Sequence, residues 1–189
     1  MASPLDNAGL GGVVSTLSDV FINLSGEYPA ILSAILILFA VAGTLISGSA
    51  AFDVIKLGKR DSGNIPGAAI LWKMVGGASM IDLAFWTHVW TSSLWSVSNP
   101  LEISAYAGGG GDYTKTAIMA VLGFIVLVGY ITLGRAYFMI TRLGYLSPES
   151  RSDLIGSIIS RIFAGSLMVA ALHVSKAFDN STGFNWIPV

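Results

Sequence analysis

Residues 43–58 read GTLISGSAAFDVIKLG, and residues 129–144 repeat the pattern as GYITLGRAYFMITRLG. Six of the sixteen aligned positions are identical, and Lys56 is matched by Arg142. Each copy ends a long apolar run, and a short polar loop and a second apolar run follow it. The pattern predicts an all-α membrane protein with four transmembrane helices, arranged as two tandem, duplicated helical hairpins.

The composition supports a membrane location. Of the 189 residues, 53% are hydrophobic and only 11% are charged, and the mean hydropathy is +0.72. Soluble domains carry about 25% charged residues. The segments 30–52 and 116–134 contain no charge, and about 20 apolar helical residues cross a hydrocarbon core of about 30 Å. Both segments are therefore predicted to span the membrane.

The second helix of each hairpin is more polar. The segments 68–95 and 154–178 carry Lys73 and Arg161 at matching positions, which predicts apolar cores at 74–94 and 162–178. Three tryptophans at the far end of the first of these segments are typical of an interfacial aromatic belt; they are Trp86, Trp90 and Trp95.

The distribution of basic residues predicts the orientation. The two turns and their flanks hold eight of the ten basic residues, whereas the opposite side has Lys115 and Lys176. Because basic residues favour the cytoplasmic side, we expect a multi-pass protein of the bacterial inner membrane with both termini in the periplasm. One of the eight is Arg135. The other seven, predicted to contact lipid headgroups or to line the lumen of a polymer, are Lys56, Lys59, Arg60, Lys73, Arg142, Arg151 and Arg161.

Five segments are expected along the chain. Residues 1–29 form an external amphipathic segment, which either lies on the outer leaflet or packs on the bundle. Residues 30–95 and 116–178 are the two hairpins. Residues 96–115 form a glycine-rich external linker, and 179–189 an external tail. The first basic residue is Lys56, so a charged signal-peptide start is missing and insertion is expected through the internal spans.

Reactive residues are sparse, and we expect no enzyme. Cysteine is absent, and His88 and His173 have no carboxylate at ligand spacing. No catalytic residue, metal site or cofactor is expected, except for a bound phospholipid. The net charge of −1 gives no basic surface for sequence-specific nucleic-acid binding.

Two polar residues are predicted to lie inside the membrane. Asp82 is nine residues beyond Lys73, or about 13 Å along a helix. Such a carboxylate marks either an ion site or a structural pair, and its counterpart in the second hairpin is Ala170. Arg135 is predicted to be a headgroup anchor, with a pair to Asp53 or to a lipid phosphate as the alternatives.

Small residues are predicted to pack the helices. Membrane helices associate closely where small residues let their backbones approach. Such packing either joins the four helices or drives self-assembly into a homo-oligomer. The residues concerned are Gly43, Ser47, Gly48, Gly77, Gly129, Gly134 and Gly165.

The hairpin pattern GxxxxGxAxF followed by a basic residue and LG, together with size and topology over residues 30–178, resembles small polytopic proteins of type IVB secretion and IncI-type conjugation systems. These are the IcmC/DotE, IcmD/DotP and TraQ/TraR proteins, and each single hairpin is similar to VirB2-type conjugative pilins. The resemblance implies a non-enzymatic subunit that assembles with other secretion or conjugation subunits into an inner-membrane complex or an extracellular pilus. The alternative is a small ion-coupled transporter or channel that uses Asp82.

Overall fold

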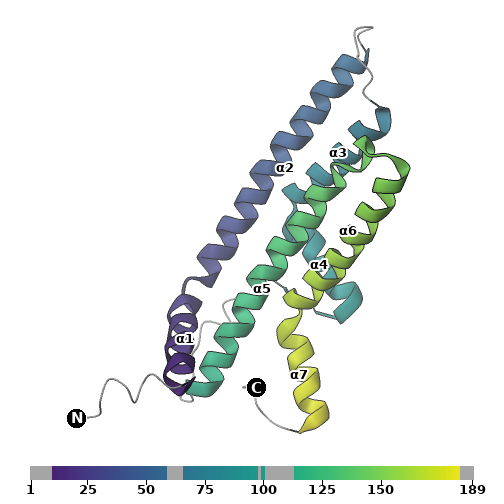
Figure 1. The fold of residues 1–189 in the computed structure, drawn as a ribbon. Coiled ribbons are helices and arrows are strands. Elements are labelled where there is room, and N and C mark those ends of the chain that lie inside the picture. Colours follow the sequence, from purple (N-terminus) through teal and green to yellow (C-terminus); the bar gives the residue numbers. More distant parts are fainter. Residues whose placement is uncertain (1–9, 59–65, 98, 101–112, 184–189) are drawn as a thin grey trace, which may run out of the picture.

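The chain forms an elongated bundle of helices, two of them longer than the others (Figure 1). The computed structural model describes residues 10–58, 66–97, 99–100 and 113–183, and within these ranges the regular structure is entirely helical. The helices α2 (Tyr28–Gly58) and α5 (Tyr113–Ile140) have 31 and 28 residues. At 1.5 Å per residue they are about 46 and 42 Å long, which exceeds the hydrocarbon core of about 30 Å.

Three segments of the described chain are long and apolar enough to cross a membrane, as expected for a multi-pass membrane protein. They are Tyr28–Gly58, Tyr113–Tyr145 and Pro148–Val169. A fourth span exists if the bent pair α3 (Gly67–Ile81) and α4 (Leu83–Trp95) is counted as one. The uncharged runs 30–52 and 116–134 lie inside α2 and α5, as the sequence predicts.

The predicted apolar core at 74–94 does not form one straight helix, because the chain turns by 86° between α3 and α4. Asp82 lies at the break with φ −115° and ψ 56°, outside the helical region. Its side-chain oxygen accepts a hydrogen bond from the Phe85 backbone N–H at 3.1 Å, which begins the new helix. Aspartate favours such helix starts because its short carboxylate satisfies a backbone donor that the first turn leaves unpaired.

The predicted apolar core at 162–178 is also misplaced. Helix α6 (Pro148–Val169) ends before Ala170, and the shorter α7 (Ala171–Thr182) follows. The candidate span is α6 itself, whereas α7 contains no buried residue. The second half of the predicted core includes polar side chains such as His173 and Lys176, which do not suit a buried position in lipid.

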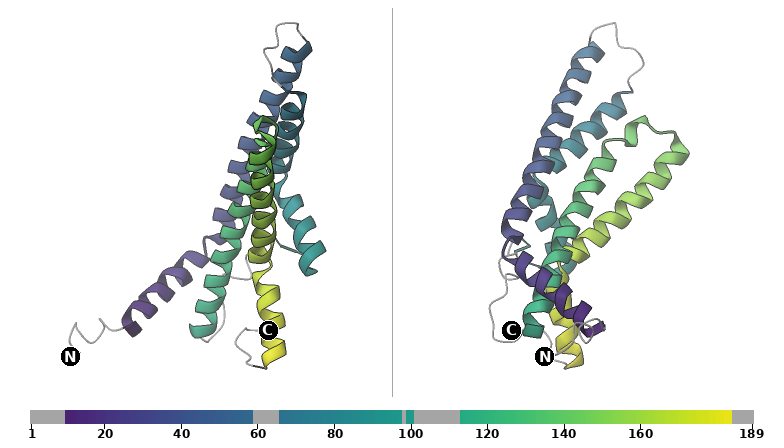
Figure 2. Two further views of the ribbon diagram at one scale, coloured as in Figure 1. Left: turned by 45° about the vertical axis from the view of Figure 1, so that its right-hand side comes forward. Right: turned by 60° about the vertical axis from the view of Figure 1, so that its left-hand side comes forward.

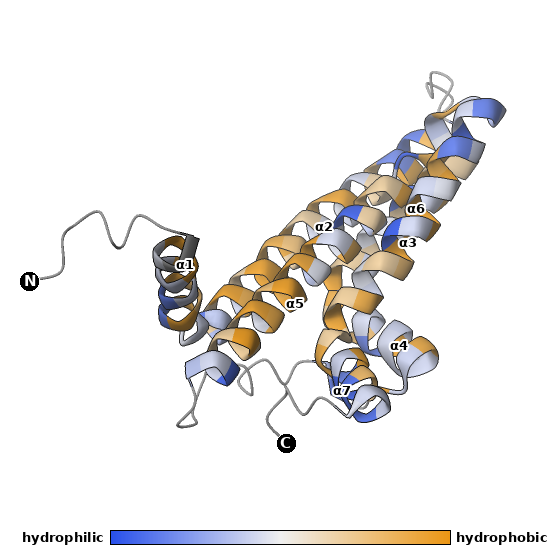
Figure 3. Ribbon diagram, turned by 60° about the horizontal axis from the view of Figure 1, so that its bottom comes forward, coloured by the Kyte–Doolittle hydropathy of each residue, from blue (hydrophilic) through white to orange (hydrophobic). Residues whose placement is uncertain are grey.

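The core lies between α2, α5 and the inner ends of α3, α4 and α6. Tyr28 at the start of α2 is fully buried and donates its hydroxyl to the Ala120 carbonyl oxygen at 2.7 Å. Figure 3 shows apolar residues along most of α2 and α5, and more hydrophilic residues toward the end where the hairpins turn. The largest buried apolar side chains of this core include Tyr28, Met80, Leu83, Val126, Tyr130 and Leu133.

Two of the tryptophans assigned to an aromatic belt donate hydrogen bonds within the bundle. The Trp90 indole N–H donates to the Tyr137 hydroxyl at 2.8 Å. Trp95 donates in the same way to the Ser166 hydroxyl at 3.2 Å. Because the bend at Asp82 turns α4 toward α5 and α6, these indoles find hydrogen-bond partners in the other hairpin.

Helix α1 (Leu10–Ser25) leans away from the bundle and touches α5 (Figure 2). Phe21 meets Phe124 edge to face at 5.3 Å, and the Tyr113 hydroxyl donates to the Asp19 carboxylate at 2.8 Å. Other apolar side chains of α1 stay exposed, including Val13 and Leu17. The two alternatives for this segment are therefore compatible, because one side packs on the bundle and another is free to meet lipid.

Candidate functional site: an arginine-lined cleft

The end of α2 and the start of α3 lie at the same end of the bundle as the turn between α5 and α6 (Figure 1). The short helix η2 (Leu143–Tyr145) follows α5 and packs against the first turn of α3. A methyl group on Gly144 would overlap the backbone of Ala69, so the absence of a side chain permits this contact. The basic residues that flank the two turns are thereby brought to one end, although Lys59 and Arg60 lie outside the described residues.

Glycines set the distance between the two helices of the first hairpin. A methyl group placed on Gly43 of α2 would lie 2.5 Å from the Gly77 carbonyl oxygen and 2.9 Å from Met80 Cβ. Conversely, a methyl group on Gly77 would lie 3.0 Å from the Gly43 carbonyl oxygen and would overlap the Ser47 hydroxyl. The two backbones therefore approach closely at this level, which only small residues permit.

The second hairpin makes the corresponding contact. A methyl group on Gly129 of α5 would lie 2.9 Å from Met168 Cβ and 2.9 Å from the Val169 nitrogen. A methyl group on Gly165 of α6 would lie 3.1 Å from the Gly129 carbonyl oxygen. These four positions align with Gly43, Gly77, Met80 and Ile81 of the first hairpin.

The remaining small residues divide into two kinds. Gly134 of α5 lies against the ring of Phe39, so it joins the two hairpins. Gly48 is the exception to the packing prediction, because a methyl group there would meet nothing within 4 Å. It lies on an exposed side of α2, since a step of five residues from Gly43 turns away from the Gly77 contact.

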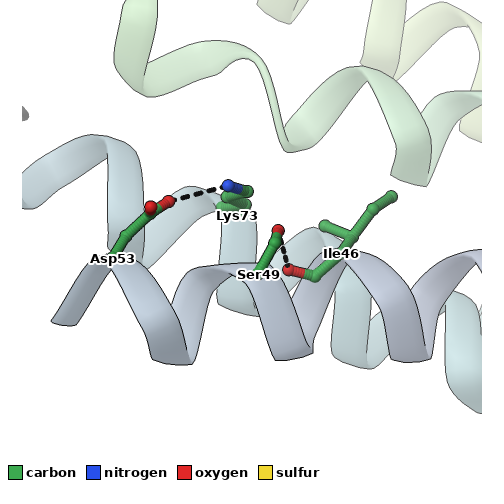
Figure 4. A network of polar contacts seen from close by, with 4 residues as sticks. All are labelled: Ile46, Ser49, Asp53 and Lys73. Carbon is green, nitrogen blue, oxygen red and sulfur yellow. Dashed lines mark hydrogen bonds and ion pairs between the residues drawn. The ribbon is translucent and has the colours of Figure 1, made fainter. Parts of the chain in front are cut away.

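At the level of the basic residues, the first hairpin contains an ion pair (Figure 4). The Lys73 ammonium nitrogen lies 2.7 Å from an Asp53 carboxylate oxygen, and the two side chains are 21% and 14% exposed. One turn earlier, the Ser49 hydroxyl donates to the Ile46 carbonyl oxygen. The suggested pair between Arg135 and Asp53 is not formed, because Asp53 is already bonded to Lys73 within its own hairpin.

The second hairpin has a cleft at the corresponding level. The cleft has a volume of about 360 Å³ and lies between α5 and α6. Its lining contains three arginines and three apolar residues, and no carboxylate among the described residues; the six are Arg135, Phe138, Met139, Arg142, Leu154 and Arg161. Three guanidinium groups that share one cleft create a strong positive potential.

Local contacts orient two of the three guanidinium groups. The Arg161 Nε donates to the Ser157 hydroxyl one turn earlier on α6, at 3.3 Å. The Arg142 guanidinium carbon lies 5.1 Å from the centre of the Phe138 ring, a cation–π contact. Within the described part of the chain, neither arginine forms an ion pair.

Aligned positions show why the two hairpins differ here. Arg161 aligns with Lys73, but Met139 stands where Asp53 stands in the first hairpin. Arg135 likewise replaces Ser49, and Arg142 replaces Lys56. The second hairpin therefore gains one cation and loses the carboxylate that neutralises the first. Sequence reasoning missed Met139, Phe138 and Leu154, although the Asp53-to-Met139 difference was visible in the alignment.

Two other basic residues have separate roles. Arg151 donates through Nε to the Leu143 carbonyl oxygen at 3.1 Å and through a terminal nitrogen to that of Leu146 at 3.2 Å. It thus holds the turn between α5 and α6. Lys56 is exposed at the end of α2.

Asp82 lies apart from this cleft. Beside its helix-capping hydrogen bond, it borders a pocket of about 190 Å³ whose other lining residues are apolar and come from α2, α3 and α4. His88 and His173 are both exposed. In the ranges that the structure covers, no three His, Cys, Asp or Glu side chains gather in a way that could hold a metal ion.

Among the described residues, the arginine-lined cleft is thus the place where several positive charges lie together without a carboxylate to neutralise them. Comparison of this chain with protein-family models, with curated proteins and with solved structures found no match.

Proposed function

We propose that this chain is a non-enzymatic subunit of the bacterial inner membrane, formed by two tandem, duplicated hairpins. The observation that carries the proposal is the repeated glycine contact. Gly43 meets Gly77 in the first hairpin, and Gly129 meets Gly165 at the aligned positions in the second. Similar sequences in similar contacts are expected if one hairpin was copied.

In this proposal both basic turns lie in the cytoplasm and both termini lie in the periplasm. The clustering of the turns at one end of the bundle is compatible with it. The basic residues beside the turns then face the side that they favour.

The proposed role is structural, in a type IVB-like secretion or conjugation apparatus. Its partners are other subunits of the apparatus and further copies of this chain, in an inner-membrane complex or a pilus-like polymer. The resemblance of the hairpins to proteins of such systems supports a role in this kind of apparatus. Exposed apolar side chains on α2, such as Leu38 and Leu45 at 70% and 69% exposure, offer a face for lipid or for a neighbouring subunit.

The topology can be tested directly, because the chain has no cysteine of its own. Single cysteines at Lys56, Ser150 and Ser181 occupy exposed positions at the first turn, the second turn and the far end. A membrane-impermeant maleimide should label the Ser181 position in spheroplasts, and the other two only after lysis. Labelling of Lys56→Cys and Ser150→Cys from opposite sides would refute the paired hairpins.

The assembly is tested by purification in a mild detergent followed by mass spectrometry. We expect further copies of the chain and other secretion or conjugation subunits to co-purify, and deletion of the gene to abolish transfer. An isolated monomer without such partners, combined with normal transfer after deletion, would reject the structural role.

A second candidate function is ion-coupled transport through Asp82. The observation that favours it is the broken helix, because transporters place ion and substrate sites where membrane helices are interrupted. Asp82 is exposed at this break and borders a pocket. In proteoliposomes, Asp82→Asn should abolish flux and leave the fold unchanged if this function is correct. Unchanged flux, or no flux in the parent chain, would exclude it.

A further inference from the structure

We propose that the cleft lined by Arg135, Arg142 and Arg161 binds the phosphate group of an anionic phospholipid. The inference rests on the proposed topology, which places this end of the bundle in the cytoplasmic headgroup layer. It goes beyond general headgroup contact, because it assigns one lipid phosphate to one cleft between α5 and α6.

The first argument is charge. The cleft gathers three positively charged side chains, and no carboxylate lines it within the described residues. In the first hairpin the aligned cation, Lys73, is neutralised by Asp53 at 2.7 Å. Met139, which stands at the position of Asp53 in the second hairpin, has no charge that could neutralise Arg161. An external anion would remove the mutual repulsion of the three guanidinium groups.

The second argument is the chemistry of the donors. Guanidinium groups offer planar, paired N–H donors that match phosphate oxygens, and they bind phosphate in a bidentate manner. The contacts of Arg161 with Ser157 and of Arg142 with Phe138 hold two of these groups in place. Less side-chain freedom is therefore lost when the anion binds.

The third argument is depth. Arg135 lies five residues before the end of α5, or about 8 Å along the helix axis. The headgroup layer on each side of a bilayer is about 5–8 Å thick. Arg135 is therefore placed near the boundary between headgroups and hydrocarbon, where basic pockets between membrane helices bind anionic headgroups.

The lining also distinguishes a lipid from a free phosphate ion. Phe138, Met139 and Leu154 supply apolar surface beside the arginines. Arg135 and Phe138 are both exposed on the surface of α5, so a lipid can reach them from the side of the bundle. The glycerol and upper acyl chain of a lipid would cover these apolar groups, whereas an inorganic phosphate would leave them in water.

The test measures lipid retained by the full chain. The protein is purified in detergent, exposed to an equal mixture of phosphatidylglycerol and phosphatidylcholine, and analysed by native mass spectrometry. We expect selective retention of a single phosphatidylglycerol. Arg135→Gln combined with Arg161→Gln should reduce this retention by roughly tenfold or more, because it removes two groups that make charge-assisted hydrogen bonds to phosphate.

The decisive variant is Met139→Asp, which keeps all three arginines and supplies the carboxylate that the first hairpin has. It should also reduce phosphatidylglycerol retention by roughly tenfold, because an internal anion next to Arg161 competes with the lipid. Lys176→Gln is the matched control, since it removes an exposed cation of α7 outside the cleft, and its retention should equal that of the parent chain.

Three outcomes would overturn the proposal. They are equal retention of the two lipids by the parent chain, undiminished retention by a Met139→Asp variant with an unchanged thermal unfolding midpoint, and displacement of the lipid by millimolar inorganic phosphate. The last result would assign the cleft to a free anion. By contrast, labelling of the two turns from opposite sides of the membrane, or purification without partner subunits, would refute the proposed function. Neither result would change the outcome of the lipid measurement.

Discussion

In the first hairpin, α2 and α3 hold Asp53 against Lys73 at the level where α5 and α6 of the second hairpin gather three arginines. Deeper in the bundle the two hairpins agree, because aligned glycines bring their helices together in the same way. The comparison shows that close backbone packing tolerates few side chains, and both hairpins meet this requirement with glycine. Charges at the helix ends are less constrained, so they can differ between the two hairpins.

The outer ends of the hairpins differ as well. Both second helices are interrupted at aligned positions, Asp82 and Ala170. The segment after the first break, α4, buries Leu83 and donates two indole hydrogen bonds to the other hairpin. The segment after the second break, α7, buries no residue. The first hairpin thus supports the second, and the predictions below test how far the two are equivalent.

The largest effect is expected from filling the glycine contacts. Gly43→Leu and Gly129→Leu each place a side chain against backbone atoms of the facing helix, which cannot move without separating the hairpin. Overpacking typically costs about 1–3 kcal/mol and more where backbone is displaced. Both variants should lower the midpoint of unfolding in detergent by similar amounts, as measured by tryptophan fluorescence.

Gly48→Leu is the control for these two variants, because the added side chain enters open space. Its unfolding midpoint should stay close to that of the parent chain. If Gly129→Leu were tolerated as well as Gly48→Leu, the second hairpin would not share the packing of the first.

A smaller effect is expected from the cations at the turn end. Lys73→Met removes the partner of Asp53, which is only 14% exposed, and leaves a largely buried carboxylate unpaired. An unsatisfied buried group costs about 1–3 kcal/mol. The double variant Asp53→Met with Lys73→Met should recover most of that loss, because it leaves no orphan charge.

The aligned substitution in the second hairpin should behave differently. Arg161→Met leaves no carboxylate without a partner in the cleft, and it relieves repulsion among the remaining arginines. Its unfolding free energy in lipid-free detergent should stay within about 0.5 kcal/mol of the parent value. A loss as large as that of Lys73→Met would mean that Arg161 has an internal partner, and the contrast between the hairpins would fail.

The sequence was sufficient for the parts of this fold that depend on local composition. The uncharged runs 30–52 and 116–134 lie within α2 and α5, because uninterrupted apolar helices of that length are stable in lipid. Five of the six glycines chosen for packing lie at close approaches, and Gly48 does not. Spacing alone could not separate them, since the contact depends on which side of α2 faces α3.

The break at Asp82 could not be predicted in the same way. A lone carboxylate in an apolar helix can bind an ion, pair with another helix or cap a new helix, and the sequence is the same in each case. The cleft depends on the rotation of α5 against α6, which brings Arg135, Arg142 and Arg161 together. The substitution of Met139 for Asp53 was a readable signal, but its meaning required the ion pair in the first hairpin.

A moderate effect is expected at the break itself. Asp82→Ala removes the acceptor for the Phe85 backbone N–H, and loss of a helix cap costs about 0.5–2 kcal/mol. Asp82→Asn should retain most of the stability, because its amide oxygen accepts the same hydrogen bond. Faster hydrogen exchange at the Phe85 amide in the alanine variant would identify the lost cap, and equal exchange in all three proteins would contradict it.

The smallest effect is expected in α7, where the second hairpin lacks the packing that α4 gives the first. Phe178 is 63% exposed, and substitutions at exposed positions usually change stability by less than about 0.5 kcal/mol. Phe178→Ala should therefore leave the unfolding free energy unchanged, whereas Trp90→Phe should lower it by about 1 kcal/mol through loss of the hydrogen bond to Tyr137. If the two variants had equal effects, α7 would be docked as firmly as α4. The asymmetry of the outer ends would then disappear, and only the charge at the turn end would distinguish the two hairpins.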